Sequence, residues 1–230
     1  MSNYSSKTAF TLAEVLITLG IIGIVAALIL PFFMANIRKN EYSNKLKKLY
    51  SIISQAVLMS EIQTGLSALD WERNGMINNE DGTSDVVANE EESYNFFIKY
   101  LAPSFKYTSI VKGGYIEENG RKKFINTKVY LVDGTVLVFT NGSCFDIVAD
   151  LNGNRMPNKG GIDIYRFLLC QGGAPQAHFG NKNQSFGTYM PVHCPTREIA
   201  LQKCKENSFY CSTLLMYDNW KFKDDYPYKL

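Results

Sequence analysis

The chain has 230 residues, of which 46% are hydrophobic and 20% are charged. This composition is ordinary for a folded protein and argues against an intrinsically disordered chain. The net charge is +2, and residues 61–230 carry 18 basic and 20 acidic side chains. The net charge of residues 61–230 is therefore close to zero, which argues against nucleic acid as a partner.

One long apolar run lies near the N-terminus. From Phe10 to Leu30 there are 21 residues, and only Thr11, Glu14 and Thr18 are polar. A helix of this length, at 1.5 Å per residue, matches the hydrocarbon core of a bilayer, which is about 30 Å thick. We therefore expect one membrane-spanning helix. A cleaved secretory signal is disfavoured because the run is too long and no A-x-A site follows it.

Positive charge is distributed unevenly around this run. Only Lys7 precedes it, and the basic residues that follow it are Arg38, Lys39, Lys45, Lys47 and Lys48. Counted alone, these charges would place the body of the protein in the cytoplasm, because cytoplasmic flanks are usually the more basic ones.

Residues 7–31, KTAFTLAEVLITLGIIGIVAALILP, resemble the leader and first helix of type IV pilins and type II secretion pseudopilins. That family has a short leader with a basic residue, a small residue before a cleavage site, and then Phe-Thr-Leu-x-Glu opening a hydrophobic helix with a proline towards its end. The residues that match in register are Lys7, Ala9, Phe10, Thr11, Leu12, Glu14 and Pro31. Ala9 departs from the family pattern, in which glycine is commoner before the cut.

The resemblance implies that a prepilin peptidase cuts between Ala9 and Phe10 and that the new amine of Phe10 is methylated. It also implies a single-pass protein of the bacterial inner membrane, with its body in the periplasm or outside the cell, in contrast to the charge count. The implied partners are other pilin-like subunits in a homo- or hetero-oligomeric filament, the peptidase, an inner-membrane assembly platform, and membrane lipid before assembly.

Glu14 needs a partner because an unpaired carboxylate in hydrocarbon costs several kcal/mol. After cleavage it lies about one turn from the amine of Phe10, near the positive end of the helix dipole. We expect Glu14 of one subunit to pair with the Phe10 amine of its neighbour and so to set the register of the filament. The alternative is a carboxylate that reaches the membrane surface on its own.

Helical spacing continues beyond Pro31, a residue that removes one backbone hydrogen bond and is predicted to kink the helix. We expect one helix of about 50 residues ending near Gly65; two helices broken at Pro31 are the alternative. The apolar stripe of the second half is Leu46, Leu49, Ile53, Ala56 and Val57.

The remaining sequence predicts a head of α+β class. After an exposed connection, residues 93–101 predict a short helix; KVYLVDGTVLVF (residues 128–139) predicts a hairpin with a two-residue turn at Asp133-Gly134, and residues 143–151 a third strand. Thr196 can cap a later helix, and Leu214, Leu215 and Trp220 are expected to pack on the head.

The predicted fold is therefore a long N-terminal helix, embedded in the membrane in its first half, that packs on a small antiparallel sheet followed by a loop-rich C-terminal region. We divide the chain into a leader (1–9), a membrane or filament-core helix (10–31), an amphipathic helix (32–64) and an extracytoplasmic head (65–230).

Five cysteines lie in the last 90 residues: Cys144, Cys170, Cys194, Cys204 and Cys211. Outside the cytoplasm such residues usually form disulfides, and a zinc site is disfavoured because no CxxC pair occurs. We expect Cys204–Cys211 and Cys170–Cys194, with Cys144 free.

A polar loop within residues 149–167 offers a candidate calcium site, and calcium is the one candidate cofactor. Its oxygen side chains are Asp150, Asn152, Asn154, Asn158 and Asp163. It resembles a D-x-N-G…P-N…G-x-D loop of some pilin-like proteins. It is not an EF-hand, because Gly161 stands where a bidentate Glu is required. The alternative is a set of Asx-turns.

The sequence predicts no enzyme. It contains no G-x-S-x-G, P-loop or H-E-x-x-H motif, and a thiol site built from Cys194 and His178 is disfavoured. We expect a structural pilin or pseudopilin that is assembled through its first helix for secretion, adhesion or motility. The alternative is a single-pass, membrane-anchored binding protein that does not polymerise.

Overall fold

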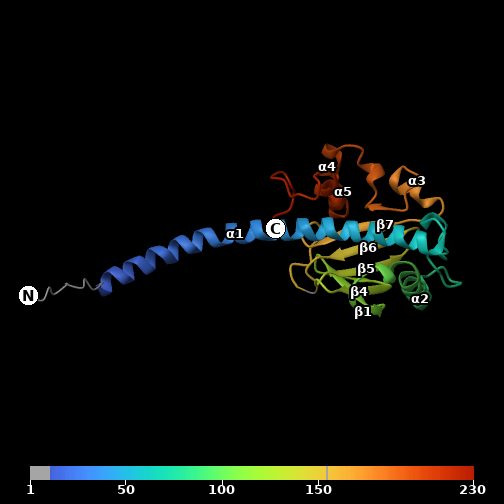
Figure 1. Cartoon of the computed structure of the whole chain (residues 1–230), viewed down its shortest axis with the longest axis horizontal. Coiled ribbons are helices and arrows are strands. Elements are labelled where there is room, and N and C mark those ends of the chain that lie inside the picture. The colour runs from blue at the N-terminus through green and yellow to red at the C-terminus, as the bar shows by residue number, and fades with distance from the viewer. Residues whose placement is uncertain (1–10, 154) are drawn as a thin grey trace, which may run out of the picture.

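The computed structural model describes residues 11–153 and 155–230 (Figure 1). Its longest element is α1 (Leu12–Thr64), whose N-terminal half projects away from a head and whose C-terminal half lies along it. The helix ends at Gly65, which has φ 70° and donates its amide to the carbonyl of Glu61. Because α1 is continuous through position 31, the alternative of two separate helices is wrong. The kink at Pro31 stays a prediction.

The head is built on a six-stranded sheet in which every neighbouring pair is antiparallel. The expected hairpin and third strand form its centre. The strands, in their order across the sheet, are β1 (Tyr107–Lys112), β4 (Thr127–Leu131), β5 (Val136–Asn141), β6 (Phe145–Asp150), β7 (Ile164–Leu169) and β8 (Phe186–Thr188). A separate hairpin consists of β2 (Tyr115–Glu118) and β3 (Arg121–Phe124).

Short helices surround this sheet. The helix expected over residues 93–101 begins earlier, because the Asp85 carboxylate accepts from the amide of Ala88 and so caps it. Thr196 caps a later helix as expected. The helical segments are η1 (Ala68–Asp70), α2 (Val86–Phe96), η2 (Phe97–Leu101), η3 (Ala102–Ser104), α3 (Ala174–Phe179), η4 (Pro191–His193), α4 (Arg197–Glu206), η5 (Ser208–Tyr210) and α5 (Cys211–Tyr217).

The turn between β4 and β5 differs from the predicted one. It has three residues, Val132 to Gly134: the Leu131 amide donates to the carbonyl of Thr135, and the Gly134 amide donates to that of Leu131. Of the expected pair only Gly134 has a positive φ, 82°. A type I turn followed by a left-handed residue fits this pattern, and it needs glycine at one position only.

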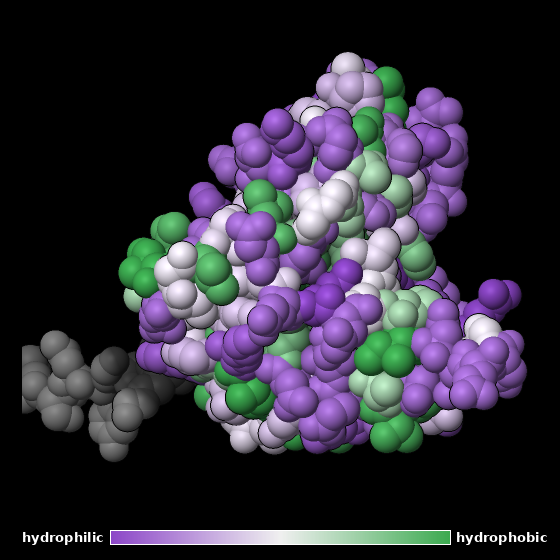
Figure 2. Space-filling view, turned by 90° about the vertical axis from the view of Figure 1, so that its right-hand side faces the viewer, coloured by the Kyte–Doolittle hydropathy of each residue, from purple (hydrophilic) through white to green (hydrophobic). Residues whose placement is uncertain are grey.

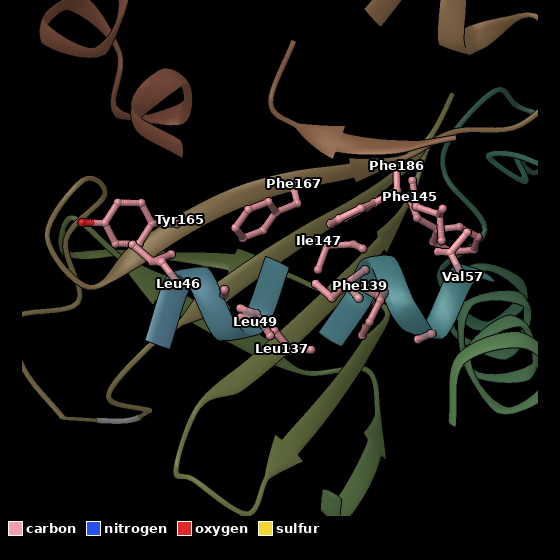
Figure 3. Close-up of a cluster of buried hydrophobic side chains, with 14 of the residues drawn as sticks. Leu46, Leu49, Val57, Leu137, Phe139, Phe145, Ile147, Tyr165, Phe167 and Phe186 are labelled. Carbon is pink, nitrogen blue, oxygen red and sulfur yellow. The ribbon is translucent and has the colours of Figure 1, made fainter. Parts of the chain in front are cut away.

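The main core lies between α1 and one face of the sheet. The expected stripe of α1 is buried, with Leu46 and Ile53 fully so, and Figure 3 shows it crossing the strands that carry Leu137, Phe139, Ile147 and Phe167. Tyr42 is the first buried residue of α1 in the described part. This stripe therefore fixes the direction in which the uncovered N-terminal part of α1, residues 12–41 (the bare half), leaves the head.

The opposite face of the sheet is covered by the β2–β3 hairpin and by α3. The first cover buries Ile116, Val138 and Val148, and the second buries Phe179 against Leu168. The expected burial of Leu214, Leu215 and Trp220 is observed. The end of the head remote from the bare half of α1 is mostly hydrophilic, with scattered apolar groups (Figure 2).

We expect Ile53→Ala to lower the free energy of unfolding of the head by about 2–5 kcal/mol, because it leaves a cavity between α1 and the sheet. Ile62→Ala is the matched control, since Ile62 lies on the same helix and is 67% exposed; its effect should be about 0.5 kcal/mol or less. Urea unfolding of the detergent-solubilised chain, followed by near-UV circular dichroism, measures both. Equal losses would contradict the packing described here.

Candidate functional site

The N-terminal part of α1 is predominantly apolar and projects away from the head (Figure 1). An 18-residue stretch of it has a mean hydropathy of 2.7, and none of that stretch is buried in the structure. By length and composition the helix is able to cross a membrane. Its exposed large apolar residues include Leu16, Ile17, Leu19, Ile21, Ile22, Ile24, Val25, Leu28, Ile29 and Leu30.

Glu14 closes a capping box with Thr11 at the start of α1. The Thr11 amide donates to Glu14 Oε2 over 2.8 Å, the Thr11 hydroxyl donates to the same oxygen over 2.7 Å, and the Glu14 amide donates to Thr11 Oγ1 over 3.2 Å. The pattern T-x-x-E predicts such a box, and our sequence analysis missed it. In the single chain, the partners of the carboxylate are therefore local.

The other residues expected at the processing site are not described by the structure. Ala9 and Phe10 lie outside the described residues, which begin at Thr11. The cleavage and methylation at these positions, and the contact between the Phe10 amine and Glu14 of a neighbour, stay predictions.

Two disulfides stabilise the head, and only one of them is the expected bond. Cys204–Cys211 is present, but Cys170 is joined to Cys144, with a Cα–Cα distance of 4.4 Å, and Cys194 is free and buried. The expected Cys170–Cys194 pair is wrong. The reason is the sheet register: Phe145 of β6 faces Leu169 of β7, so the residues just outside them face each other.

The polar loop between β6 and β7 is organised by one carboxylate. Asp163 Oδ2 accepts from the amide of Asn158 over 2.9 Å and from Asn152 Nδ2 over 3.1 Å, and Asp163 Oδ1 accepts from the amide of Lys159 over 2.6 Å. Asp150 Oδ1 accepts from the amide of Asn152 over 3.2 Å. The Asp150 contact is that of an Asx-turn, the alternative considered from the sequence, whereas Asp163 reaches back four and five residues and closes the loop.

Part of the proposed calcium ligand set remains available in this loop. Asn152 Oδ1 and Asn158 Oδ1 are buried and have no hydrogen-bond partner within the described ranges 11–153 and 155–230. Burial, together with the nearby Asp163 carboxylate, raises the pKa of Asp150 to about 7. Amide and carboxylate oxygens are the ligands that Ca²⁺ prefers, so the described donors fit the ion. Asn154, a fifth candidate, lies outside the described residues.

No hydrogen bond joins the two candidate residues for thiol chemistry in the part of the chain that the structure describes. His178 Nε2 lies 3.3 Å from the hydroxyl of Ser143, on the face that α3 covers. Cys194 packs in the main core, and burial raises the pKa of its thiol, which keeps it protonated. This geometry fits packing rather than nucleophilic catalysis.

If the loop binds calcium, Ca²⁺ at about 10 mM, above the Kd of weak extracellular sites, will raise the unfolding temperature of the chain. Asp150→Asn and Asp163→Asn should abolish this rise, because each removes one of the two carboxylates. Asp224→Asn is the matched control, since Asp224 is an exposed aspartate outside the loop. Thermal unfolding with Ca²⁺ and with a chelator measures the shift. An unchanged temperature for the parent chain would contradict the calcium site.

Two family comparisons match this chain and together cover nearly all of it. Residues 4–30 match the prokaryotic N-terminal methylation motif, which is the prepilin-type motif of type IV pilins and pseudopilins. Residues 32–230 match a family described as a family of unknown function (DUF6613). No curated protein and no solved structure matches the chain.

Proposed function

We propose that this chain, which belongs to the family of unknown function DUF6613, is a pilin or pseudopilin subunit of a type IV filament that serves secretion, adhesion or motility. The observation that carries the proposal is the methylation motif at residues 4–30, followed by a helix whose first half is bare and whose second half is docked on a head. The motif points to a structural, non-enzymatic subunit. Motif and apolar helix together suit a membrane-anchored protein.

In the proposed pathway the chain is first a single-pass protein of the bacterial inner membrane, and its head lies on the non-cytoplasmic side. Prepilin peptidase removes residues 1–9, the amine of Phe10 is methylated, and an assembly platform moves the subunit into a filament with like or related subunits. The exposed apolar side chains in the N-terminal part of α1 support this route, because such a surface can be covered by lipid or by other apolar helices.

The contacts of Glu14 support a role in assembly. Both Thr11 donors bind Oε2, and Oε1 accepts no hydrogen bond from any residue that the structure describes. A carboxylate held in this way is oriented by its own chain and still has one oxygen available. We propose that this oxygen receives the Phe10 ammonium of the neighbouring subunit, an ion pair that is strong in a medium of low dielectric constant.

A plain membrane anchor, the alternative, needs neither cleavage nor a carboxylate in its span. The two proposals differ in the N-terminus of the mature protein. We expect mass spectrometry of the chain, purified from cells that contain prepilin peptidase, to find a methylated Phe10 as the first residue. A chain that retains residues 1–9 in such cells would contradict the filament proposal and favour the anchored binding protein.

We expect Glu14→Gln to stop filament assembly. Glutamine accepts the capping hydrogen bonds of Thr11 but carries no charge, so this variant separates the ion pair from the capping box. Glu14→Ala, which removes both, should fail equally. The measurement is the amount of filament sheared from cells that express the assembly machinery.

The matched control is Glu206→Gln, a charge removal on the exposed surface of α4. This variant should assemble like the parent chain, and all variants should keep both head disulfides. Normal filaments from Glu14→Gln would contradict the ion-pair mechanism and leave Glu14 as a helix cap.

A further inference from the structure

A groove lies where α1 enters the head. It has a volume of about 280 Å³ and runs between α1 and the loop that joins β6 to β7. This loop lies at the end of the head from which the bare half of α1 leaves (Figure 1). The helix contributes Met34, Ile37, Arg38, Glu41 and Tyr42, and the loop contributes Asn152, Arg155 and Met156.

We propose that this groove binds the phosphate of an anionic phospholipid in the membrane leaflet that faces the head. The inference rests on the proposed function, because it concerns the subunit while it is anchored in the membrane before assembly. It assigns a lipid-recognition role to Arg38 and Arg155, which neither the methylation motif nor the core of the head explains.

The groove lies at the depth of the lipid headgroups when the span is in the membrane. Glu14 is most stable at the membrane boundary, so the hydrocarbon core begins beside it. Twenty helical residues from Val15 to Met34 span about 30 Å, the thickness of that core. The groove begins at Met34 and extends about two further turns, which places it at the level of the lipid headgroups. A tilted helix would place it closer still.

Two arginine side chains give the groove a positive charge. Arg38 makes no salt bridge with any residue of the described ranges, and Arg155 uses its Nε to donate to the carbonyl of Asn152 over 3.1 Å, which leaves the terminal nitrogens of its guanidinium. The groove contains one carboxylate, Glu41, and Lys45 lies 3.3 Å from it. The two guanidinium groups therefore dominate, and guanidinium is well suited to a phosphodiester.

Three apolar side chains form the rim of the groove. Met34, Ile37 and Met156 border the two arginines and are 53%, 52% and 73% exposed. A soluble phosphate ion would gain nothing from these side chains. A phospholipid presents its phosphate directly above acyl chains, so it satisfies the guanidinium groups and covers the rim together.

The proposal also gives a partner to one of the basic residues that follow the span. Lys45 donates to the carbonyl of Leu151 over 2.8 Å, and Lys48 lies 3.3 Å from a carboxylate oxygen of Asp133, so both hold α1 on the head. Arg38 has no such role within the described chain. A basic residue on the non-cytoplasmic side, which the positive-inside rule disfavours, thus acquires a partner in the membrane itself.

The test uses the full-length chain, reconstituted into vesicles of phosphatidylcholine alone or with about 30% phosphatidylglycerol, an anionic lipid. A fluorophore is attached at Asn40→Cys, an exposed position of α1 that does not line the groove; the native thiol Cys194 is buried and the other cysteines are disulfide-bonded. Quenching by lipids that carry a spin label on the headgroup reports whether this end of the head lies at the membrane surface. A fluorophore at Lys182→Cys, three residues after α3, should remain unquenched, because α3 lies at the remote end of the head (Figure 1).

We expect quenching at position 40 to be about twofold stronger with the anionic lipid, and Arg38→Gln/Arg155→Gln to reduce it to the value in phosphatidylcholine. Lys47→Gln/Lys182→Gln is the matched control: it removes the same charge from exposed positions outside the groove and should leave the quenching unchanged. Equal quenching in both vesicles, or no effect of the arginine substitutions, would overturn the proposal.

Two other outcomes separate this inference from neighbouring ones. If the signal follows the ratio of protein to lipid instead of the lipid composition, the groove is an interface between copies of the chain and the lipid proposal is wrong. If the chain does not float with vesicles at all, the membrane anchor of the proposed function fails. A chain that floats but shows no lipid-dependent quenching overturns only the groove.

Discussion

The packing of the second half of α1 on the six-stranded sheet is the contact on which the rest of the structure depends. One continuous helix has to be stable in two surroundings, and the buried stripe that includes Leu46 and Ile53 divides them. Before Tyr42, every described side chain of α1 is exposed or half-buried; along the stripe, the sheet provides the apolar partner. Because the head is rigidly attached to that stripe, the orientation of the bare half is set by the core.

The polar groups of the bare half are few, and their local contacts matter for this reason. Glu14 is held by the amide and hydroxyl of Thr11, which lowers the cost of placing a carboxylate at the edge of hydrocarbon. The same contacts leave one carboxylate oxygen available at the helix start. A subunit that is stable in the membrane and still able to gain an ion pair on assembly has the property that a filament precursor requires.

The loop between β6 and β7 connects the core of the head to the groove beside α1. Asn152 donates to Tyr42 of α1 and to Asp163, and Arg155 and Met156 of the same loop border the groove beside α1. Binding of an ion at the carboxylates and binding of a lipid at the arginines would therefore act on one segment. The position of this segment on α1 follows from the stripe.

Local patterns in the sequence were sufficient for the elements that neighbouring residues control. The apolar run, the stripe from Leu46 to Val57, the end of α1 at Gly65 and the Thr196 cap each depend on a few adjacent side chains, and they were predicted correctly. The sequence also carried the prepilin-type motif, because the residues of this motif are close to one another in the chain.

Other features depend on distant segments, and only the tertiary structure decided them. Strand β7 is buried on both faces, so its sequence lacks an alternating pattern. The pairing of Cys144 with Cys170 follows from the register of β6 on β7. Arg38 and Arg155, which are 117 positions apart, share a groove only because the sheet places their segments side by side.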